Sequence, residues 1–235
     1  MPTSLSISLF LSHTRTHTLS SLPLRRWTVN LRFLPEPIFA SPTLSAGLLA
    51  THALLLAAFA STHWVAGEPG GLLGVAARFW ARGFKGKNTR SRSIRSKGAA
   101  TAAAPPPPRP PPGPALAALA TGNLLGIAAA RSLHYQFYAW YAQSLPLLLW
   151  GVDVEGALGR AGRRKGVRRA APGKGVKAAA VLLRLGVWAG VEAAWNVFPA
   201  TPASSSLLTA MHILLVAGLW WAPAGWTQGR NDVRV

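Results

Sequence analysis

The sequence predicts an all-α protein, a polytopic integral membrane helical bundle with about five spans joined by disordered basic loops. Three observations predict this class. Of the 235 residues, 50% are hydrophobic and only 13% are charged, whereas a soluble domain carries about 25% charged residues. The charges are unequal, with 25 Lys and Arg against 6 Asp and Glu. Apolar and basic blocks also alternate along the chain with little overlap, which is typical of spans and their connecting loops.

The first predicted span is the apolar segment 44–66, which follows a leader and luminal pre-span segment at residues 1–43. It contains no formal charge. A helix of this length reaches about 30 to 35 Å, enough to cross the hydrocarbon core of a bilayer. Pro42 lies just before the segment, where proline fits the start of a helix.

A basic and proline-rich segment follows at residues 67–114. Its middle part carries eight Lys and Arg residues between Arg78 and Lys97, and its end is rich in proline between Pro105 and Pro112. Each central Lys or Arg costs about 3 kcal/mol to insert into a membrane, and polyproline forms an extended spacer instead of a packed helix. We therefore expect a disordered cytosolic loop here.

Residues 115–150 contain two short apolar segments, 115–130 and 137–150, on either side of a polar turn. One long helix through this region would bury Arg131 and His134 in the membrane, which is costly. Two short spans that meet at the turn are the more economical interpretation. A re-entrant hairpin is the alternative.

A second basic loop at residues 151–177 precedes the last two spans, which are expected at about 178–198 and 205–224 within residues 178–224. The tail 225–235 is short and weakly basic. Because two spans separate the two basic loops, both loops are expected on one side of the membrane. The positive-inside rule makes that side cytosolic. The polar turn of the preceding region is then luminal, and the tail is cytosolic.

The densest group of polar and aromatic residues lies in and after this predicted luminal turn. Arginine binds phosphate oxygens through its forked guanidinium, and His and Gln hydrogen-bond hydroxyls. An aromatic belt at the membrane interface is the structural alternative. The candidate substrate-binding residues in this group are Arg131, His134, Tyr135, Gln136 and Tyr138.

The fourth predicted span contains two further candidates, Glu192 and Asn196. Acids within a membrane are functional candidates by default, although a structural hydrogen bond between helices is an equally fair interpretation. Arg184 lies near the cytosolic end of the same span and is expected to snorkel outward. The close acidic pair Asp153 and Glu155 lies on the predicted cytosolic side beside basic residues, so we expect no metal site. No cofactor is expected either, and no catalytic residue is assigned.

Small residues and histidines within the spans are expected to serve helix packing. Glycines four residues apart allow close helix approach. Two such pairs occur: Gly122 with Gly126, and Gly186 with Gly190. Three scattered histidines lack metal-ligand spacing and are interpreted as packing or interfacial residues: His52, His63 and His212.

The basic loops have a second interpretation as nucleic-acid-binding segments, because residues 89–93 form an arginine–serine stretch. No aromatic residues interleave with these charges, as they do in single-stranded nucleic-acid sites. Membrane orientation and attraction to lipid headgroups explain the loops with fewer assumptions. We therefore expect no nucleic-acid partner; salt-sensitive RNA retention by residues 78–97 would reverse this expectation.

Residues 132–138, with the sequence SLHYQFY, closely resemble the C-terminal region of one enzyme family. That family is the dolichyl-phosphate-mannose-dependent α-1,3-mannosyltransferases of asparagine-linked glycosylation. The resemblance continues at residues 192–202, EAAWNVFPATP, and at residues 27–36, WTVNLRFLPE. The similar parts cover roughly residues 27–64, 115–150 and 178–221.

This resemblance implies part of a larger transferase fold of the GT-C type, in the endoplasmic reticulum membrane, with its active site facing the lumen. The implied donor is dolichyl-phosphate-mannose, and the implied acceptor is the five-mannose dolichyl-diphosphate oligosaccharide. Mannose would be added in α-1,3 linkage with inversion, which requires a luminal carboxylate as general base. Glu36 joins the candidate substrate-binding residues on this basis, with anchoring at the interface as its alternative role.

The sequence also departs from the family pattern. Family members are longer, and their acidic first luminal loop has no counterpart here, so we expect an incomplete C-terminal portion. Leu31 stands where an aromatic is expected and Pro37 where a second acid is expected. The basic stretches 67–114 and 151–177 resemble insertions. The alternative function is therefore a non-catalytic membrane fragment or scaffold.

Overall fold

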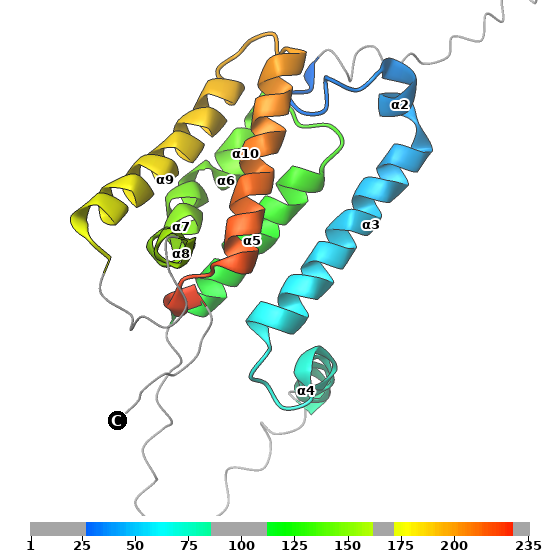
Figure 1. Cartoon of the computed structure of the whole chain (residues 1–235). Coiled ribbons are helices and arrows are strands. Elements are labelled where there is room, and N and C mark those ends of the chain that lie inside the picture. The colour runs from blue at the N-terminus through cyan, green and yellow to red at the C-terminus, as the bar shows by residue number, and fades with distance from the viewer. Residues whose placement is uncertain (1–26, 86–111, 162–171, 228–235) are drawn as a thin grey trace, which may run out of the picture.

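The computed structural model describes residues 27–85, 112–161 and 172–227, which form helices and turns with no β-strand among them (Figure 1). Four of these helices are long and apolar enough to cross a membrane. The predicted class, a polytopic all-α membrane protein, is therefore confirmed. The predicted arginine–serine stretch, most of the proline run, and parts of the leader, second basic loop and tail lie outside the described residues: 1–26, 86–111, 162–171 and 228–235.

The first spanning helix is α3 (Pro42–Phe59), which continues into a π-helical turn at Ala60–Trp64. It follows the short helix α2 (Glu36–Ala40). Ser41 caps α3 by accepting the N–H of Leu44 at 3.1 Å, and this cap starts the helix two residues before the predicted boundary. Only 6% of its most apolar 18-residue window is buried inside the protein, so much of this helix is available to lipid.

The other spanning helices are α5 (Pro112–Ala129), α9 (Lys174–Trp195) and α10 (Pro202–Trp221). Helices α9 and α10 are sequential and lie side by side (Figure 1). Gly190 permits their close approach, since a Cβ there would lie 2.7 Å from Sδ of Met211 on α10. On α5, a Cβ at Gly126 would meet the His52 ring of α3 at 3.6 Å, so this glycine also faces a neighbouring helix.

The predicted third span is a broken segment instead of one continuous helix. After a 3-10 turn at Tyr135–Phe137 it forms α6 (Tyr138–Tyr141), a second 3-10 turn at Ala142–Ser144 and α7 (Leu145–Trp150). Pro146 explains the break, because it has no N–H to donate to the carbonyl one turn earlier. Irregular backbone at membrane depth is tolerated where other protein elements cover it, and several side chains of this segment are buried: Tyr141, Leu145, Leu148 and Leu149.

Two helices occupy segments that were expected to be disordered. Helix α4 (Gly71–Lys85) lies in the first basic loop, and α8 (Val154–Ala161) begins the second. The expectation of disorder is wrong for these residues. The expectation was based on the number of charges alone. The apolar residues between those charges recur with a helical period, which is sufficient for an amphipathic helix.

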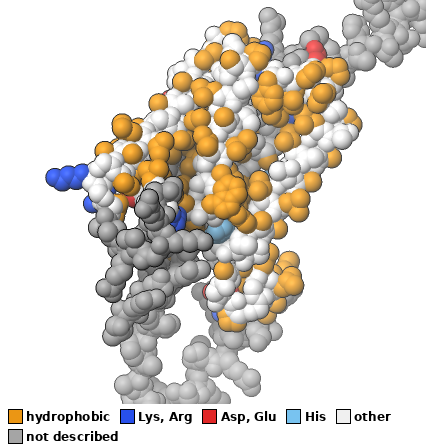
Figure 2. All heavy atoms as spheres, viewed as in Figure 1, with side chains coloured by type: hydrophobic (Ala, Val, Ile, Leu, Met, Phe, Trp, Pro, Cys, Tyr) orange, Lys and Arg blue, Asp and Glu red, His pale blue; other side chains and the backbone are white. Residues whose placement is uncertain are grey.

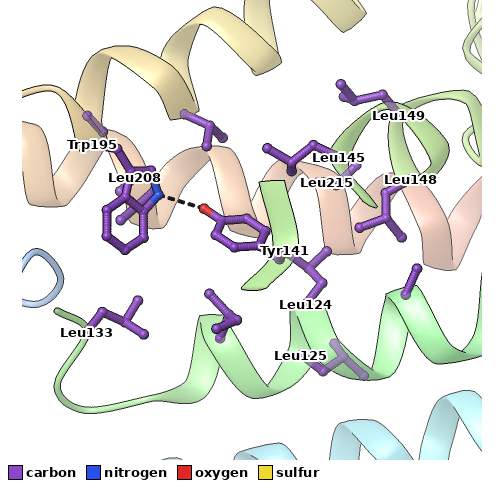
Figure 3. Packing of buried hydrophobic residues seen from close by; sticks show 14 of the residues in the cluster. Leu124, Leu125, Leu133, Tyr141, Leu145, Leu148, Leu149, Trp195, Leu208 and Leu215 are labelled. Atoms are coloured by element: carbon purple, nitrogen blue, oxygen red, sulfur yellow. Dashed lines mark hydrogen bonds between the residues drawn. The ribbon is translucent and has the colours of Figure 1, made fainter. Parts of the chain in front are cut away.

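The apolar core lies where α5, α6, α7, α9 and α10 meet. Leu124 and Leu125 of α5 pack with Tyr141, and side chains from α7 and α10 complete the cluster (Figure 3). Leu145 and Leu208 are almost completely buried there. Helix α3 stands at the edge of this core and contributes Phe59 to it.

The bundle has two chemically different ends. At one, called here the turn end, the pre-span segment meets the polar turn and the α9–α10 link: Val29 N–H donates to the Leu133 carbonyl at 2.7 Å, and Arg32 N–H donates to Oγ of Ser205 at 2.9 Å. The basic end holds α4, α8 and the start of α5 (Figure 1). The polar turn and the two basic segments thus lie at opposite ends. Which end faces the lumen stays a prediction.

Candidate functional site

The carboxylate of Glu192 lies at the centre of a polar cluster near the turn end. It is three residues from the end of α9 and half-buried. The Tyr138 hydroxyl of α6 donates to its Oε1, and Trp188 Nε1 donates to the same oxygen at 3.1 Å. Both donors are neutral, so the negative charge of the carboxylate is hydrogen-bonded but not paired with a cation in these contacts.

A second polar chain lies beneath this cluster in the buried core. Trp195 Nε1 donates to the Tyr141 hydroxyl at 2.7 Å (Figure 3), and that hydroxyl lies 2.9 Å from Nε2 of His212. Because the hydroxyl already accepts from Trp195, its own proton satisfies His212 Nε2 if the imidazole is neutral and carries its proton on Nδ1. Tyr141 also packs edge-on against Tyr138, with ring centroids 5.9 Å apart. The hydrogen-bonded residues Trp195, Tyr141 and His212 thus support the Tyr138 ring, whose hydroxyl donates to Glu192, from the core side.

Tyr135 joins the polar turn to the end of α9. Its hydroxyl donates to the Val197 carbonyl at 2.7 Å, and its ring packs edge-on against Phe198 with a centroid distance of 5.4 Å. Burial raises the pKa of Tyr135, and this effect exceeds the lowering by a backbone hydrogen bond from Ala200 and by the charge of Arg32. The phenol is therefore a neutral hydrogen-bonding group, and its contacts hold the ring in place between the polar turn and the end of α9.

Three of the predicted residues have side chains that are more exposed or make fewer contacts than the tyrosines do. Asn196 donates from Nδ2 to the Glu192 main-chain carbonyl at 2.8 Å and so caps the end of α9, with its side chain exposed. His134 stacks on Phe137 at a centroid distance of 6.2 Å. Gln136 is exposed. Exposed amides at this end are able to contact a sugar, which the buried groups cannot do.

Arg131 lies against a different part of the molecule from Glu192. Its Nη1 donates to Oγ of Ser45 on α3 at 2.9 Å, and its guanidinium carbon lies 5.9 Å from the centre of the Phe39 ring on α2. Glu36 begins that same short helix and is half-buried. The structure therefore divides the predicted site. Tyr135, Tyr138, Glu192 and Asn196 gather at the end of α9, whereas Arg131 contacts α2 and α3.

The expectation that Arg184 snorkels outward is wrong. The residue is only 5% exposed, and its two terminal nitrogens each donate to an oxygen of Glu155 at 2.8 Å. It also donates to the carbonyls of Leu149 at 3.2 Å and Val152 at 2.9 Å. Helix α7 ends at Trp150, and the two carbonyls accept main-chain N–H groups of the following turn, from Val152 at 3.4 Å and from Val154 at 3.0 Å. A carbonyl oxygen has two lone pairs, so each carbonyl is able to accept from the guanidinium as well and to hold it inside.

The acidic pair of the second basic loop also has a structural role. The hydrogen bonds from Arg184 lower the pKa of Glu155, more than burial raises it. Asp153 accepts the Gly156 N–H on Oδ1 at 2.9 Å, which caps α8. Within the described parts of the chain, no group of three or more His, Asp or Glu side chains could hold a metal ion.

Three polar neighbours of the Glu192 cluster were not identified from the sequence. Trp188 precedes Glu192 by one helical turn, and this spacing alone could have indicated the contact. Tyr141 was not among the candidates, and His212 was interpreted as a packing or interfacial residue. Their hydrogen bond joins residues 71 positions apart, and no local pattern reports such a contact.

An apolar groove of about 520 Å³ runs between α3, α5 and α10. Its lining extends from Leu31 at the turn end to Trp221 near the opposite end of α10, with Leu55 and Val216 between them. His212 forms part of the same wall. The groove therefore adjoins the buried polar chain and follows the direction of the spans.

The chain was compared with known proteins. The model of the ALG3 protein family matches residues 10–205, which is most of the sequence. This chain belongs to the ALG3 protein family. The resemblance predicted from the SLHYQFY and EAAWNVFPATP segments is thereby confirmed.

Individual members of the family carry the name Dol-P-Man:Man(5)GlcNAc(2)-PP-Dol alpha-1,3-mannosyltransferase. The member from Arabidopsis thaliana is 36% identical over 198 residues, which are 84% of this chain and 37% of the relative. The members from Neurospora crassa and Mus musculus are both 33% identical and cover 88% and 89% of this chain, respectively. The chain spans less than two-fifths of the length of these curated relatives. No solved structure matches it.

Proposed function

We propose that this chain takes part in transferring an α-1,3-linked mannose from dolichyl-phosphate-mannose to the five-mannose dolichyl-diphosphate oligosaccharide, in the endoplasmic reticulum membrane. One observation carries the proposal: the chain belongs to the ALG3 family, and relatives at 33–36% identity are named for this reaction. The four apolar spanning helices supply the membrane setting that lipid-linked substrates need.

The proposed reaction forms a bond between the acceptor hydroxyl oxygen and C1 of the donor mannose. The bond from C1 to the phosphate oxygen breaks, dolichyl phosphate leaves, and the hydroxyl proton passes to a base. Among the described residues, the acids at the turn end are Glu36 and Glu192. We assign Glu192 to sugar binding, because two neutral donors hold its orientation while the carboxylate stays half-buried. The base itself is not assigned.

The remaining turn-end residues complete the proposed substrate-binding surface. Exposed Gln136 and Asn196 are placed to hydrogen-bond sugar hydroxyls, and half-buried His134 is able to do the same. Arg131 lies at the α2–α3 side, where a guanidinium would stabilise the phosphate of a leaving group. In this arrangement sugar and phosphate bind on two sides of the polar turn.

The apolar groove supports a substrate that carries a long hydrocarbon chain. We propose that the isoprenoid chain of the donor lies along it, since the groove starts at Leu31 near the turn end and follows the spans. Ala217→Phe, at the groove wall, is expected to raise the KM for dolichyl-phosphate-mannose more than the KM for a donor with a truncated isoprenoid chain. Equal effects on both donors would contradict this placement.

The test of the function is the lipid-linked oligosaccharide profile of a yeast strain that lacks its own α-1,3-mannosyltransferase and expresses this chain alone. A shift from the five-mannose species to larger species is the expected result. Glu192→Gln, expressed at an equal level in the membrane, is the matched variant and should reduce the shift. An unchanged profile, with the protein present in the membrane, would contradict the proposal for this chain. That result would favour a non-catalytic membrane fragment or scaffold.

A further inference from the structure

Helix α4 (Gly71–Lys85) is the one long described helix that is neither a candidate span nor part of the bundle core. Its charged and apolar side chains lie on opposite faces. Arg78 and Arg82 are four residues apart and therefore share one face, whereas Leu73 and Trp80 are seven apart and share the other. This division is typical of helices that lie in a membrane interface.

The apolar face of α4 is open to the surroundings of the bundle. Leu73 is 82% exposed and Trp80 is 64% exposed, and Phe79 at the edge of this face is 75% exposed. Hydrophobic side chains cover the visible face of α3 and α10 and continue onto the α4 region (Figure 2). The apolar surface of α4 therefore lies beside the apolar surface that the spans present to lipid.

The position of α4 along the membrane normal follows from its distance to the span. The apolar stretch that includes α3 ends at Trp64, and α4 begins seven residues later. The stretch contains 23 residues and is therefore about 35 Å long, the thickness of the hydrocarbon core and little more. Helix α4 must then start at the level of the headgroups.

The direction of α4 is fixed by its first turn. Gly70 and Gly71 have φ angles of +76° and +56°, which permit a sharp change of chain direction. Arg78 then donates to the Pro69 carbonyl at 2.6 Å and to Glu68 at 2.8 Å, which holds the helix against the turn. In Figure 1 α4 is seen nearly end-on, whereas α3 runs along the page. Such a helix lies across the span direction and parallel to a membrane surface.

We propose that α4 is a membrane-surface helix whose Leu73–Trp80 face inserts into the headgroup–acyl boundary of a leaflet rich in anionic lipid. Arg82 is exposed on the opposite face and lies near the phosphate level, where a cation is attracted to anionic headgroups. Arg78 on the same face is paired with Glu68 and holds the turn. The inference is independent of the transferase activity.

The test uses the full chain in vesicles and exploits its lack of cysteine. Single substitutions Trp80→Cys and Arg82→Cys provide attachment sites for a nitroxide label on opposite faces of the helix, because residues two positions apart point in nearly opposite directions around an α-helix. In phosphatidylcholine–phosphatidylserine vesicles, the label at position 80 should collide mainly with oxygen dissolved in lipid. The label at position 82 should collide mainly with a water-soluble nickel chelate. Leu73→Cys should behave like position 80.

Two controls separate the lipid surface from other occupants of the apolar face. In vesicles without phosphatidylserine, and in the Arg82→Gln background, the label at position 80 should move toward water. Equal access of the nickel chelate to positions 80 and 82 would overturn the proposal. Spin–spin coupling between labels at position 80 would also overturn it, because the face would then contact a second copy of the chain.

Discussion

Arg184 and Glu192, two ionisable side chains in the apolar part of helix α9, have surroundings that differ in kind. They are eight residues apart, about 12 Å along the helix. Arg184 is buried and donates to both oxygens of Glu155 and to two main-chain carbonyls. Glu192 is half-buried, and its described side-chain contacts are hydrogen bonds from Tyr138 and Trp188.

The difference separates a structural charge from a candidate functional one. A buried charge with matched partners in good geometry has little capacity left for a ligand, and its removal costs stability. A carboxylate has about four acceptor positions, and the hydrogen bonds from Tyr138 and Trp188 both reach Oε1 of Glu192. Intramembrane ionisable residues are therefore better judged by their unused hydrogen-bonding capacity than by their depth.

The largest expected effect is on stability at the Arg184 site. Glu155→Leu removes the acid and leaves the guanidinium buried without its counter-charge. We expect a loss of about 3–5 kcal/mol of unfolding free energy, the usual cost of breaking one side of a buried pair. Unfolding of the full chain in detergent micelles, followed by circular dichroism, measures this loss.

The double variant Arg184→Met/Glu155→Leu is the matched control. Replacing both members of a buried pair by apolar residues is often nearly neutral, so the double variant should be more stable than Glu155→Leu alone. If the two variants lose equal stability, the ion pair is not the source of the effect and the first half of the comparison fails.

The second effect is on activity at the Glu192 site. Glu192→Gln keeps the shape and one acceptor oxygen but removes the negative charge. If the carboxylate orients the bound sugar, kcat/KM for mannose transfer should fall by roughly 100-fold, as for a misplaced reactant. The unfolding free energy should change little, because the side chain is only half-buried.

A role of Glu192 in positioning substrate is separated from a role in folding by comparing the fall in kcat/KM with the change in unfolding free energy. Arg184→Met/Glu155→Leu alters α9 at Arg184 and α8 at Glu155 and should keep most of its activity per folded molecule. A Glu192→Gln protein that keeps full activity, or that unfolds as readily as Glu155→Leu, would place Glu192 among the structural charges.

A third and smaller effect is expected in the buried chain that links Trp195, Tyr141 and His212. Tyr141→Phe removes the hydroxyl and leaves two buried polar groups without this partner. The cost of such unsatisfied groups is about 1–3 kcal/mol. His212→Phe with Tyr141→Phe removes two of the three groups and should recover part of this loss. No recovery in the double variant would indicate that the hydroxyl and the imidazole do not depend on each other.

The spans could be predicted from the sequence because their signal is local. The apolar run that contains α3 and the Pro42 start were read directly from composition and position. The break in α6–α7 was not predicted. A segment crossing the bundle in pieces is stable only because α5, α9 and α10 cover it, and such coverage is a property of the tertiary fold.

The site was predicted in part for the same reason. Sequence proximity placed Tyr135 and Tyr138 together with Arg131, yet the structure turns Arg131 toward α3 and the tyrosines toward α9. The contacts of Arg184 depend on where α7 ends, because the turn that follows it presents the Leu149 and Val152 carbonyls to the guanidinium. Contacts across long sequence separations decide which polar residue is used for structure.

The last prediction concerns pH and refines the Arg184 side of the comparison. The pKa of Glu155 is lowered in the folded protein, chiefly by hydrogen bonds from Arg184. A lowered pKa stabilises the folded state above the unfolded value, which is about 4.3 for Glu, and this stabilisation is lost as pH falls through the folded pKa. The unfolding free energy should therefore decrease more steeply on acidification in the original chain than in Arg184→Met/Glu155→Leu. Parallel pH profiles would show that the pair contributes nothing through its ionisation, and Arg184 would then be held by the Leu149 and Val152 carbonyls alone.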